Sequence, residues 1–320
     1  MKKSFLDFPK QFAYQPIIKN NKKYRPTKKY IVLGMGGSHL AADVIKSVYP
    51  QLNIIIHKDY NLPPLSDKEL KNYLIIASSY SGNTAEVISG VSLAYRKKLN
   101  IIIIAVGGKL IKFAIAKNLP YIQIPNTNIQ PRSALGFSCR ALLKAMKQNQ
   151  ANKNLHQLAK TLSGQKYEKA GKKLAQQLKN RVPIVYSSEH NLALAYNWKI
   201  KFNETGKIPA FYNVLPELNH NEMTGFDVAD KTKNLSKNFS FIFIQDNKDH
   251  SQLKKRMAVT GQLYQKRGLP IINIKLSGHN RWQEIFANLL LADWASYYTS
   301  QGYGLESEQV PMVEEFKKMI

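Results

Sequence analysis

The sequence predicts an α/β protein of two lobes with mainly parallel sheets, followed by a closing helix at the C-terminus. Three observations lead to this fold class. Short apolar runs rich in β-branched residues alternate with helix-length segments, which is typical of parallel strands joined by crossover helices. The same rhythm begins again in the second half, after a polar, Lys- and Gln-rich stretch at residues 146–180. The length of 320 residues also fits two domains of about 150 residues each.

The first half, residues 1–150, shows the alternation most clearly. Strands are expected at residues 30–33, 53–57, 74–77, 101–106 and 121–124. Helices are expected at residues 40–48, 84–97 and 110–117. Each strand is an almost continuous apolar run, so we expect a sheet that is buried on both faces.

The second half, residues 151–320, repeats the pattern after connecting helices. Strands are expected at residues 183–187, 210–214, 241–244 and 271–274, and helices at residues 192–203, 251–267 and 282–300. The last segment, residues 311–319, begins with Pro311 and carries Met312, Val313 and Phe316 at helical spacing, so it is expected to dock as the closing helix. The halves share an architecture without a clear sequence repeat, which favours a duplicated and diverged α/β unit.

The charge balance is strongly basic, with 47 Lys and Arg against 21 Asp and Glu and a net charge of +26. The basic residues are spread along the chain without a nucleic-acid-binding motif, so we expect no specific nucleic-acid partner, although a positive surface attracts anionic substrates. No segment approaches the ~18 apolar residues of a membrane span, so no membrane partner is expected. The basic start lacks the apolar core of a signal peptide, and Cys139 is the single cysteine, which together predict a cytoplasmic protein.

Two turns rich in glycine and serine follow predicted strands and precede predicted helices. They are Gly-Met-Gly-Gly-Ser at residues 34–38 and Ser-Tyr-Ser-Gly-Asn-Thr at residues 79–84. Such turns offer backbone N–H groups, the positive end of a helix dipole and uncharged hydroxyl donors, so they predict a phosphate site. The candidate phosphate-binding residues are Gly36, Gly37, Ser38, Ser79, Ser81 and Thr84. Alternatively, Thr84 is only a helix N-cap and the serines only form turns. No G-x-G-x-x-G pattern is present, which disfavours a nicotinamide dinucleotide.

Three charged or titratable side chains stand out beyond these turns. Arg132, in the sequence Pro-Arg-Ser-Ala, follows the fifth predicted strand, and the carboxyl edge of a parallel sheet is where ligands bind in open α/β folds. Glu204 lies where a predicted helix ends and a strand begins, and His220 lies in the polar loop Asn-His-Asn-Glu. The alternatives are a surface ion pair for Arg132 and an exposed helix-end acid for Glu204. The other histidines share no metal-ligand spacing, so no metal site is predicted.

Taken together and in this order, these motifs resemble the bifunctional phosphoglucose/phosphomannose isomerase family, and the resemblance covers nearly the whole chain. It implies two SIS-type (sugar isomerase) α/β sandwich lobes, an N-terminal domain at residues 1–150 and a C-terminal isomerase domain at residues 151–320. It also implies an aldose–ketose isomerase that interconverts glucose 6-phosphate and fructose 6-phosphate, with mannose 6-phosphate as a further substrate. The reaction would pass through a cis-enediol, without a cofactor or metal ion.

The resemblance also implies a role for each candidate residue. The glycines, serines and threonine of the two turns would bind the sugar phosphate. Glu204 would be the general base that moves a proton between C2 and C1, and Arg132 would be a fixed countercharge for the enediolate. His220 would open the sugar ring from across a dimer interface, so a homodimer is expected. A lysine near the C-terminus would assist, and Lys317 is favoured over Lys318.

Two positions depart from the family's pattern. His39 stands where members usually carry a small residue, which is expected to narrow the phosphate pocket. Val310, seven residues before Lys317, stands where the superfamily tends to have Gln in strict glucose enzymes and Thr in dual ones, which leaves the mannose activity open. The alternative function is a non-catalytic sugar-phosphate-binding SIS regulator, which would keep the phosphate turns but would not need both Glu204 and His220.

Overall fold

The computed structural model describes residues 1–319 and divides into two compact units. The first lobe is Leu6–Leu162, and the second lobe is Met1–Phe5 together with the chain from Ser163 onward. The expected boundary at residue 150 differs from this division for a physical reason. The helices α7 (Asn149–His156) and α8 (Leu158–Thr161) pack against the first lobe's 3-10 helix η1 (Phe8–Ala13), so the first lobe extends to residue 162.

The start of the chain belongs to the second lobe because of one aromatic anchor. Phe5, in α1 (Lys2–Leu6), is buried and packs edge-to-face on Trp294 with ring centroids 5.3 Å apart. The N-terminal amine also pairs with Glu308 at 2.9 Å. The polypeptide therefore begins in the second lobe and then builds the whole of the first.

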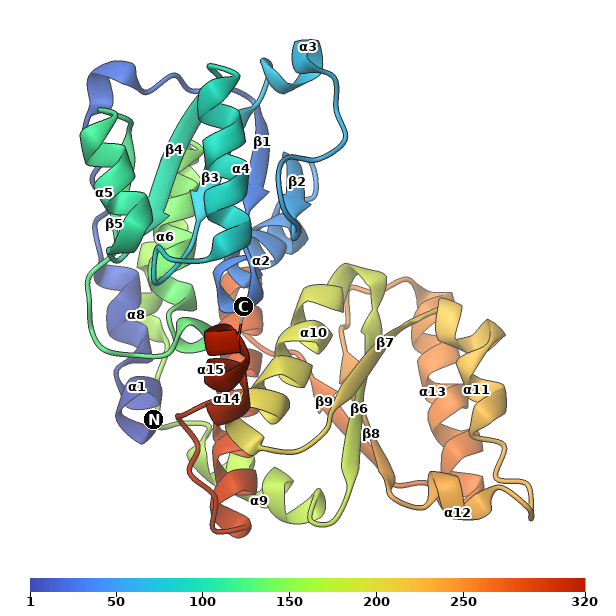
Figure 1. Cartoon of the computed structure of the whole chain (residues 1–320). Helices are drawn as coiled ribbons and strands as arrows, with labels where there is room; N and C mark the ends of the chain where they lie inside the picture. The colour runs from blue at the N-terminus through green and yellow to red at the C-terminus, as the bar shows by residue number, and fades with distance from the viewer. Residues whose placement is uncertain (320) are drawn as a thin grey trace. The chain divides into compact units, whose positions relative to one another are not determined.

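A five-stranded parallel sheet forms the centre of the first lobe, in the order β2-β1-β3-β4-β5 (Figure 1). Its strands are β1 (Lys29–Leu33), β2 (Asn53–His57), β3 (Leu74–Ser78), β4 (Asn100–Ala105) and β5 (Tyr121–Gln123). Its other helices are η2 (Asn21–Lys23), η3 (Gly36–Ser38), α2 (Leu40–Val48), α3 (Asp67–Leu70), α4 (Ala85–Arg96), α5 (Gly108–Ala116), η4 (Pro131–Ser133) and α6 (Leu135–Ala145). All pairs are parallel, as the continuous apolar runs predict.

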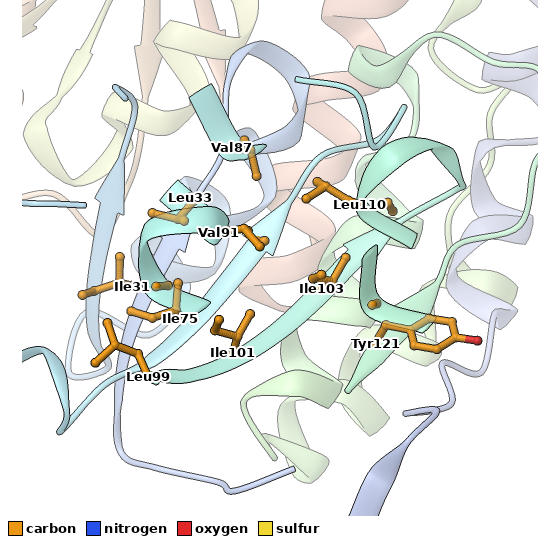
Figure 2. Close-up of a cluster of buried hydrophobic side chains, with 14 of the residues drawn as sticks. Ile31, Leu33, Ile75, Val87, Val91, Leu99, Ile101, Ile103, Leu110 and Tyr121 are labelled. Atoms are coloured by element: carbon orange, nitrogen blue, oxygen red, sulfur yellow. The ribbon is translucent and has the colours of Figure 1, made fainter. Parts of the chain in front are cut away.

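Both faces of this sheet are buried, which explains why its strands do not alternate in polarity. Figure 2 shows one face, where Ile31, Ile75 and Ile103 meet the side chains of α4 and α5. The neighbours of these residues along each strand point to the opposite face and are buried too, and α2 and α6 contact the strands there.

The second lobe contains a four-stranded parallel sheet in the order β7-β6-β8-β9 (Figure 1). Its strands are β6 (Val182–Ser188), β7 (Phe211–Leu215), β8 (Phe239–Gln245) and β9 (Ile271–Lys275). Its other helices are α9 (Glu168–Gln177), η5 (Glu189–Asn191), α10 (Leu192–Lys201), the π-helical turn η6 (Phe202–Gly206), η7 (Glu217–His220), α11 (Glu222–Gly225), α12 (Lys233–Ser236), α13 (Ser251–Lys266), α14 (Arg281–Gly302) and α15 (Pro311–Met319). The hydrophobic core on the α13 side is aromatic, with Tyr186, Phe241 and Tyr264 packed together.

The closing helix forms with the expected bounds, but it buries none of its residues in the described chain. Met312 and Phe316 are 81% and 59% exposed, so the apolar face predicted from their spacing points outward. Within residues 1–319, no helix is long and apolar enough to cross a membrane.

Candidate active site

The two phosphate-candidate turns lie at the topological switch point of the first lobe's sheet. In the order β2-β1-β3-β4-β5, the chain leaves β1 toward one edge and leaves β3 toward the other, so a crevice opens between the carboxyl ends of β1 and β3. Residues 34–38 follow β1, and residues 79–84 follow β3. The topology therefore brings together the two turns that the sequence singles out, at the place where open α/β sheets bind ligands.

The hydroxyl groups of these turns bond within and between the turns. Ser79 Oγ and Thr84 Oγ1 are 2.7 Å apart, and Ser38 Oγ accepts a hydrogen bond from the Tyr80 N–H at 2.9 Å. Ser81 Oγ accepts from the Asn83 N–H at 3.2 Å. The Ser38 bond ties the first turn to the second across the crevice.

Thr84 occupies the N-cap position of α4 but does not cap the helix. Its backbone is extended there, and its side chain makes no capping bond because its hydroxyl pairs with Ser79 instead. Thr84 thus stands at the N-cap position, as the alternative interpretation expects, but without a side-chain capping bond. The first N–H groups of α4 have no side-chain cap, which suits them to bind an anion.

The second turn is held rigid by a neighbouring loop. Gly82 has φ +73°, and a Cβ at this position would lie 1.9 Å from the carbonyl oxygen of Gly107. The Asn83 side chain accepts a hydrogen bond from the Lys109 N–H at 2.9 Å. Only glycine fits position 82, and the close packing preorganises the turn.

Arg132 contacts the first turn through its backbone. It lies in η4, and a Cβ on Gly37 would come within 2.8 Å of the Arg132 backbone nitrogen, so η3 and η4 are in direct contact. Arg132 is only 2% exposed, so it does not lie on the open surface. A buried arginine therefore lies next to the first hydroxyl-rich turn.

His39 directly follows the first turn and points into the fold. Its Nδ1 lies 2.6 Å from Oδ2 of Asp43, one helical turn further along α2, and the side chain is buried. The expectation that His39 narrows the phosphate pocket stays a prediction.

Glu204 lies within the π-helical turn η6, not after the end of the helix. α10 ends at Lys201, two residues earlier than expected, and its last turn widens into η6 before Lys207 adopts a left-handed conformation with φ +59°. Turns of π-helix are rare in proteins overall, but those that occur are often found at functional sites. The Glu204 side chain is half-buried, and its backbone carbonyl accepts a hydrogen bond from Lys207 Nζ at 2.8 Å.

A buried ion pair anchors the helix just before Glu204. Lys201 Nζ lies 2.5 Å from Oδ1 of Asp293 on α14, and both side chains are buried. Lys207 Nζ also donates to the carbonyl oxygen of Gln309, so the segment before α15 lies against the Glu204 turn. These contacts bring Val310, the next residue, close to the same turn.

His220 is exposed on a loop that is fixed on both sides. It ends η7, and the preceding Asn219 donates to Thr260 Oγ1 on α13 at 2.8 Å. Two residues further on, the Glu222 carboxylate accepts hydrogen bonds from the Tyr186 hydroxyl and the Asn213 amide. The imidazole is thus presented to the outside from a well-supported position.

Glu204 and His220 lie at opposite ends of β7. η6 precedes this strand and η7 follows it, and its five extended residues rise about 3.3 Å each. Figure 1 shows β7 running from the end of α10 toward α11. Within one chain, the second lobe does not bring these two side chains together.

Lys317 lies on α15, where its Nζ pairs with Glu314 Oε1 at 2.7 Å and both side chains are more than half exposed. The choice between Lys317 and Lys318 stays a prediction. Among residues 1–319, no group of three or more His, Cys, Asp or Glu side chains could hold a metal ion.

The sheet of the second lobe has a switch point of its own, between β6 and β8. Ion-paired side chains lie at the carboxyl ends of these two strands. Asp246, directly after β8, accepts from Arg281 Nη1 at 2.7 Å and from the Asn191 amide at 3.1 Å. Burial alone would raise the pKa of Asp246, but the Lys248 N–H, Asn191 and Arg281 outweigh it and hold the pKa below its ordinary value. A permanent carboxylate here disfavours an anionic ligand.

Comparison with known proteins identifies the family of the chain. A relative from Caldicellulosiruptor bescii, named bifunctional phosphoglucose/phosphomannose isomerase, is 31% identical over 100% of this chain and 98% of its own. The chain belongs to the bifunctional phosphoglucose/phosphomannose isomerase family. A second relative of this name, from Aquifex aeolicus, is 29% identical and covers 97% of this chain and 95% of its own.

Family membership and the fold confirm the resemblance inferred from the motifs. The family model for the bacterial phospho-glucose isomerase C-terminal SIS domain matches residues 167–320, which lie in the second lobe. A solved structure of a hypothetical protein from Thermus thermophilus has a TM-score of 0.71 at 15% identity, covering 99% of this chain and 89% of that one. This likeness shows the fold and confirms the predicted α/β architecture, and the family model identifies a SIS domain in the second lobe.

The structure of this bifunctional isomerase family member also reveals residues that the motifs do not indicate. Lys207 holds the Glu204 turn by a hydrogen bond to the Glu204 carbonyl. In the sequence, only its position directly after the Glu-Thr-Gly motif could have indicated this role. Lys201 and Asp293 are 92 residues apart in sequence, and no local pattern connects them. Buried charges of this kind are found from packing, not from motifs.

Proposed function

We propose that this protein interconverts glucose 6-phosphate and fructose 6-phosphate, and also accepts mannose 6-phosphate. The observation that carries this proposal is the end-to-end match to relatives named bifunctional phosphoglucose/phosphomannose isomerases. The switch point of the first lobe supports a phosphorylated substrate, because uncharged hydroxyls, uncapped helix N–H groups and a buried arginine gather there.

Within this proposal, Glu204 removes the proton from C2 of the open-chain aldose and returns it to C1 of a cis-enediol. Its half-buried position on a rigid π-turn supports this role, since a general base must be held at a fixed distance from the carbon acid. Arg132 is the preorganised countercharge for the enediolate oxygen, and Lys317 assists ring opening.

The test is a coupled assay of the purified protein with fructose 6-phosphate, following glucose 6-phosphate and mannose 6-phosphate together. Glu204→Gln should remove both products while binding of a sugar phosphate, measured by calorimetry, persists. Glu189→Gln, at an exposed acid of the same lobe, is the matched control and should keep parental activity. Sugar-phosphate binding without turnover by the parent would instead indicate a regulator.

Substrate range is tested at Val310, whose neighbour Gln309 is held at the Glu204 turn by Lys207. A threonine there would supply the hydroxyl that valine lacks. We expect Val310→Thr to raise the ratio of mannose to glucose product. An unchanged ratio would remove Val310 from the specificity site.

We further propose a homodimer in which His220 opens the sugar ring in the partner's site. Two observations support it: His220 is exposed, and β7 separates it from Glu204 in its own chain. The outward apolar face of α15 also leaves surface that a second copy would cover.

Mixing two inactive variants tests this arrangement directly. In a heterodimer of Glu204→Gln and His220→Ala, one of the two sites regains both residues if the histidine crosses over. Random reassortment would then restore about a quarter of the parental activity, because half of the dimers are mixed and each has one good site. If both residues act within one chain, the mixture stays inactive.

A further inference from the structure

The loop that carries Arg132 is clamped by a side chain from the start of the first lobe. Gln11, in η1, donates its amide N–H to the Ser133 carbonyl oxygen at 2.7 Å. Its amide oxygen accepts from the N–H groups of Gly136 and Phe137, at 3.0 and 3.3 Å. One buried side chain thus satisfies a carbonyl of η4 and two of the first N–H groups of α6.

The fit between Gln11 and this loop is close. A Cβ on Gly136 would lie 2.7 Å from Gln11 Cβ, so the glycine allows the approach. On its other side, the backbone of Arg132 abuts Gly37 of the first phosphate turn. The Arg132 segment is therefore enclosed between the Gln11 amide and the turn that precedes α2.

Because these hydrogen bonds are buried, losing one of them is costly. Gln11 is 4% exposed, so water does not readily replace a partner that is lost, and each unsatisfied backbone group would favour a shift of the loop. The residue at the N-cap position of α6 is Ala134, which cannot cap the helix. Gln11 supplies from a distance the cap that the local sequence lacks.

We propose that Gln11 is a positioning residue for catalysis: it fixes the guanidinium of Arg132 where negative charge develops. This inference rests on the proposed function of Arg132. A preorganised countercharge acts mainly in the transition state, so loss of its positioning lowers kcat more than it raises KM.

The experiment compares Gln11→Leu, Gln11→Glu and a matched control in the full-length protein, with fructose 6-phosphate as substrate. The control is His156→Phe, which removes a 3.0 Å hydrogen bond from α7 to the Phe12 carbonyl of the same η1 segment but leaves the Arg132 loop alone. Two kinds of measurement are made: steady-state kinetics, which give kcat and KM, and hydrogen exchange of the Gly136 and Phe137 amides by NMR.

We expect Gln11→Leu to lower kcat about tenfold or more with little change in KM, and to speed exchange of both amides. Gln11→Glu keeps the acceptor for the two N–H groups but puts a carboxylate oxygen in place of the N–H donor to the Ser133 carbonyl, so at neutral pH it should lower kcat as well without removing side-chain volume. His156→Phe should change neither quantity. In an Arg132→Leu background, Gln11→Leu should cause no further loss, because the two residues act through one group.

Each other outcome overturns the inference at a definite step. Unchanged amide exchange would mean that Gln11 does not clamp the loop in solution. Faster exchange with parental kcat, or the same fold loss in both backgrounds, would make Gln11 a structural residue only. Full activity of Arg132→Leu by itself would refute the proposed function of Arg132, and this single variant separates that failure from a failure of the clamp.

Discussion

Replacing Lys201 with methionine should destabilise the second lobe by about 3–5 kcal/mol, the usual cost of breaking a buried ion pair from one side. The Lys201 ammonium and the Asp293 carboxylate are 2.5 Å apart, and their side chains are 3% and 5% exposed. Methionine replaces the lysine stem at similar volume, so the packing changes little. What remains is a buried carboxylate that has lost the lysine cation, which is why the expected loss is large.

The chain offers a probe that reports this lobe alone. Its three tryptophans, Trp198, Trp282 and Trp294, all lie in the second lobe, so tryptophan fluorescence during urea unfolding follows that lobe. With a urea m-value of about 1–3 kcal/mol/M, a loss of about 3–5 kcal/mol lowers the midpoint by roughly 1–5 M. Such a shift is easily resolved.

Two further variants decide whether the reasoning is right. Removing both charges, in Lys201→Met with Asp293→Leu, should recover most of the lost stability, because neither buried charge of the pair is then left behind. Lys233→Met breaks an exposed pair with Asp230 in the same lobe and should leave the midpoint unchanged. A parental midpoint for Lys201→Met, or a double variant no more stable than the single one, would refute the argument.

Three more predictions follow from other sites. Gly82→Ala should cost about 1–3 kcal/mol or more and weaken sugar-phosphate binding, measured by calorimetry, because its Cβ would meet the Gly107 carbonyl and its φ is +73°. Asp246→Asn should lower the free energy of unfolding at pH 7, because the folded protein holds the pKa of Asp246 below its ordinary value. This stabilisation is complete only above the ordinary Asp pKa and is lost as the pH falls through the lowered pKa of the folded state. The difference in unfolding free energy between parent and variant should therefore shrink below about pH 4. Burial raises the pKa of the Cys139 thiol, so a thiol reagent should label it only after denaturant is added.

The parts of the fold that depend on local sequence could be predicted, and those that depend on distant packing could not. β4 is a continuous isoleucine run because both faces of its sheet are covered, and that pattern is visible in the sequence. The end of α10 was not predicted correctly: Gly206 resembles a helix stop, whereas the chain widens into the π-turn that carries Glu204. That turn is held in place by contacts to Asp293 and Gln309, and no motif near Glu204 in the sequence predicts these partners.

The candidate site shows the same difference. The residue types of the phosphate turns and Arg132 are readable because phosphate and enediolate chemistry need hydroxyls, N–H groups and a fixed cation. The Gln11 bond to the Ser133 carbonyl spans 122 residues, so only the folded chain reveals it. Likewise, Thr84 has the sequence signature of an N-cap, and only the structure shows its hydroxyl paired with Ser79.

The two lobes have the same strand order around their switch points, yet only one edge is suited to an anion. After β1 and β3 the chain places hydroxyls and uncapped N–H groups, whereas after β6 and β8 it places Asp246, locked to Arg281 and Asn191. The paired charges at the carboxyl ends of β6 and β8 therefore disfavour a second phosphate site in that lobe. Glu204 lies before the amino-terminal end of β7, and His220 lies after its carboxyl end. If Glu204 acts as proposed, the phosphate turns and the base come from different sheets, and variants of Thr84 and Glu204 should then affect substrate binding and turnover separately.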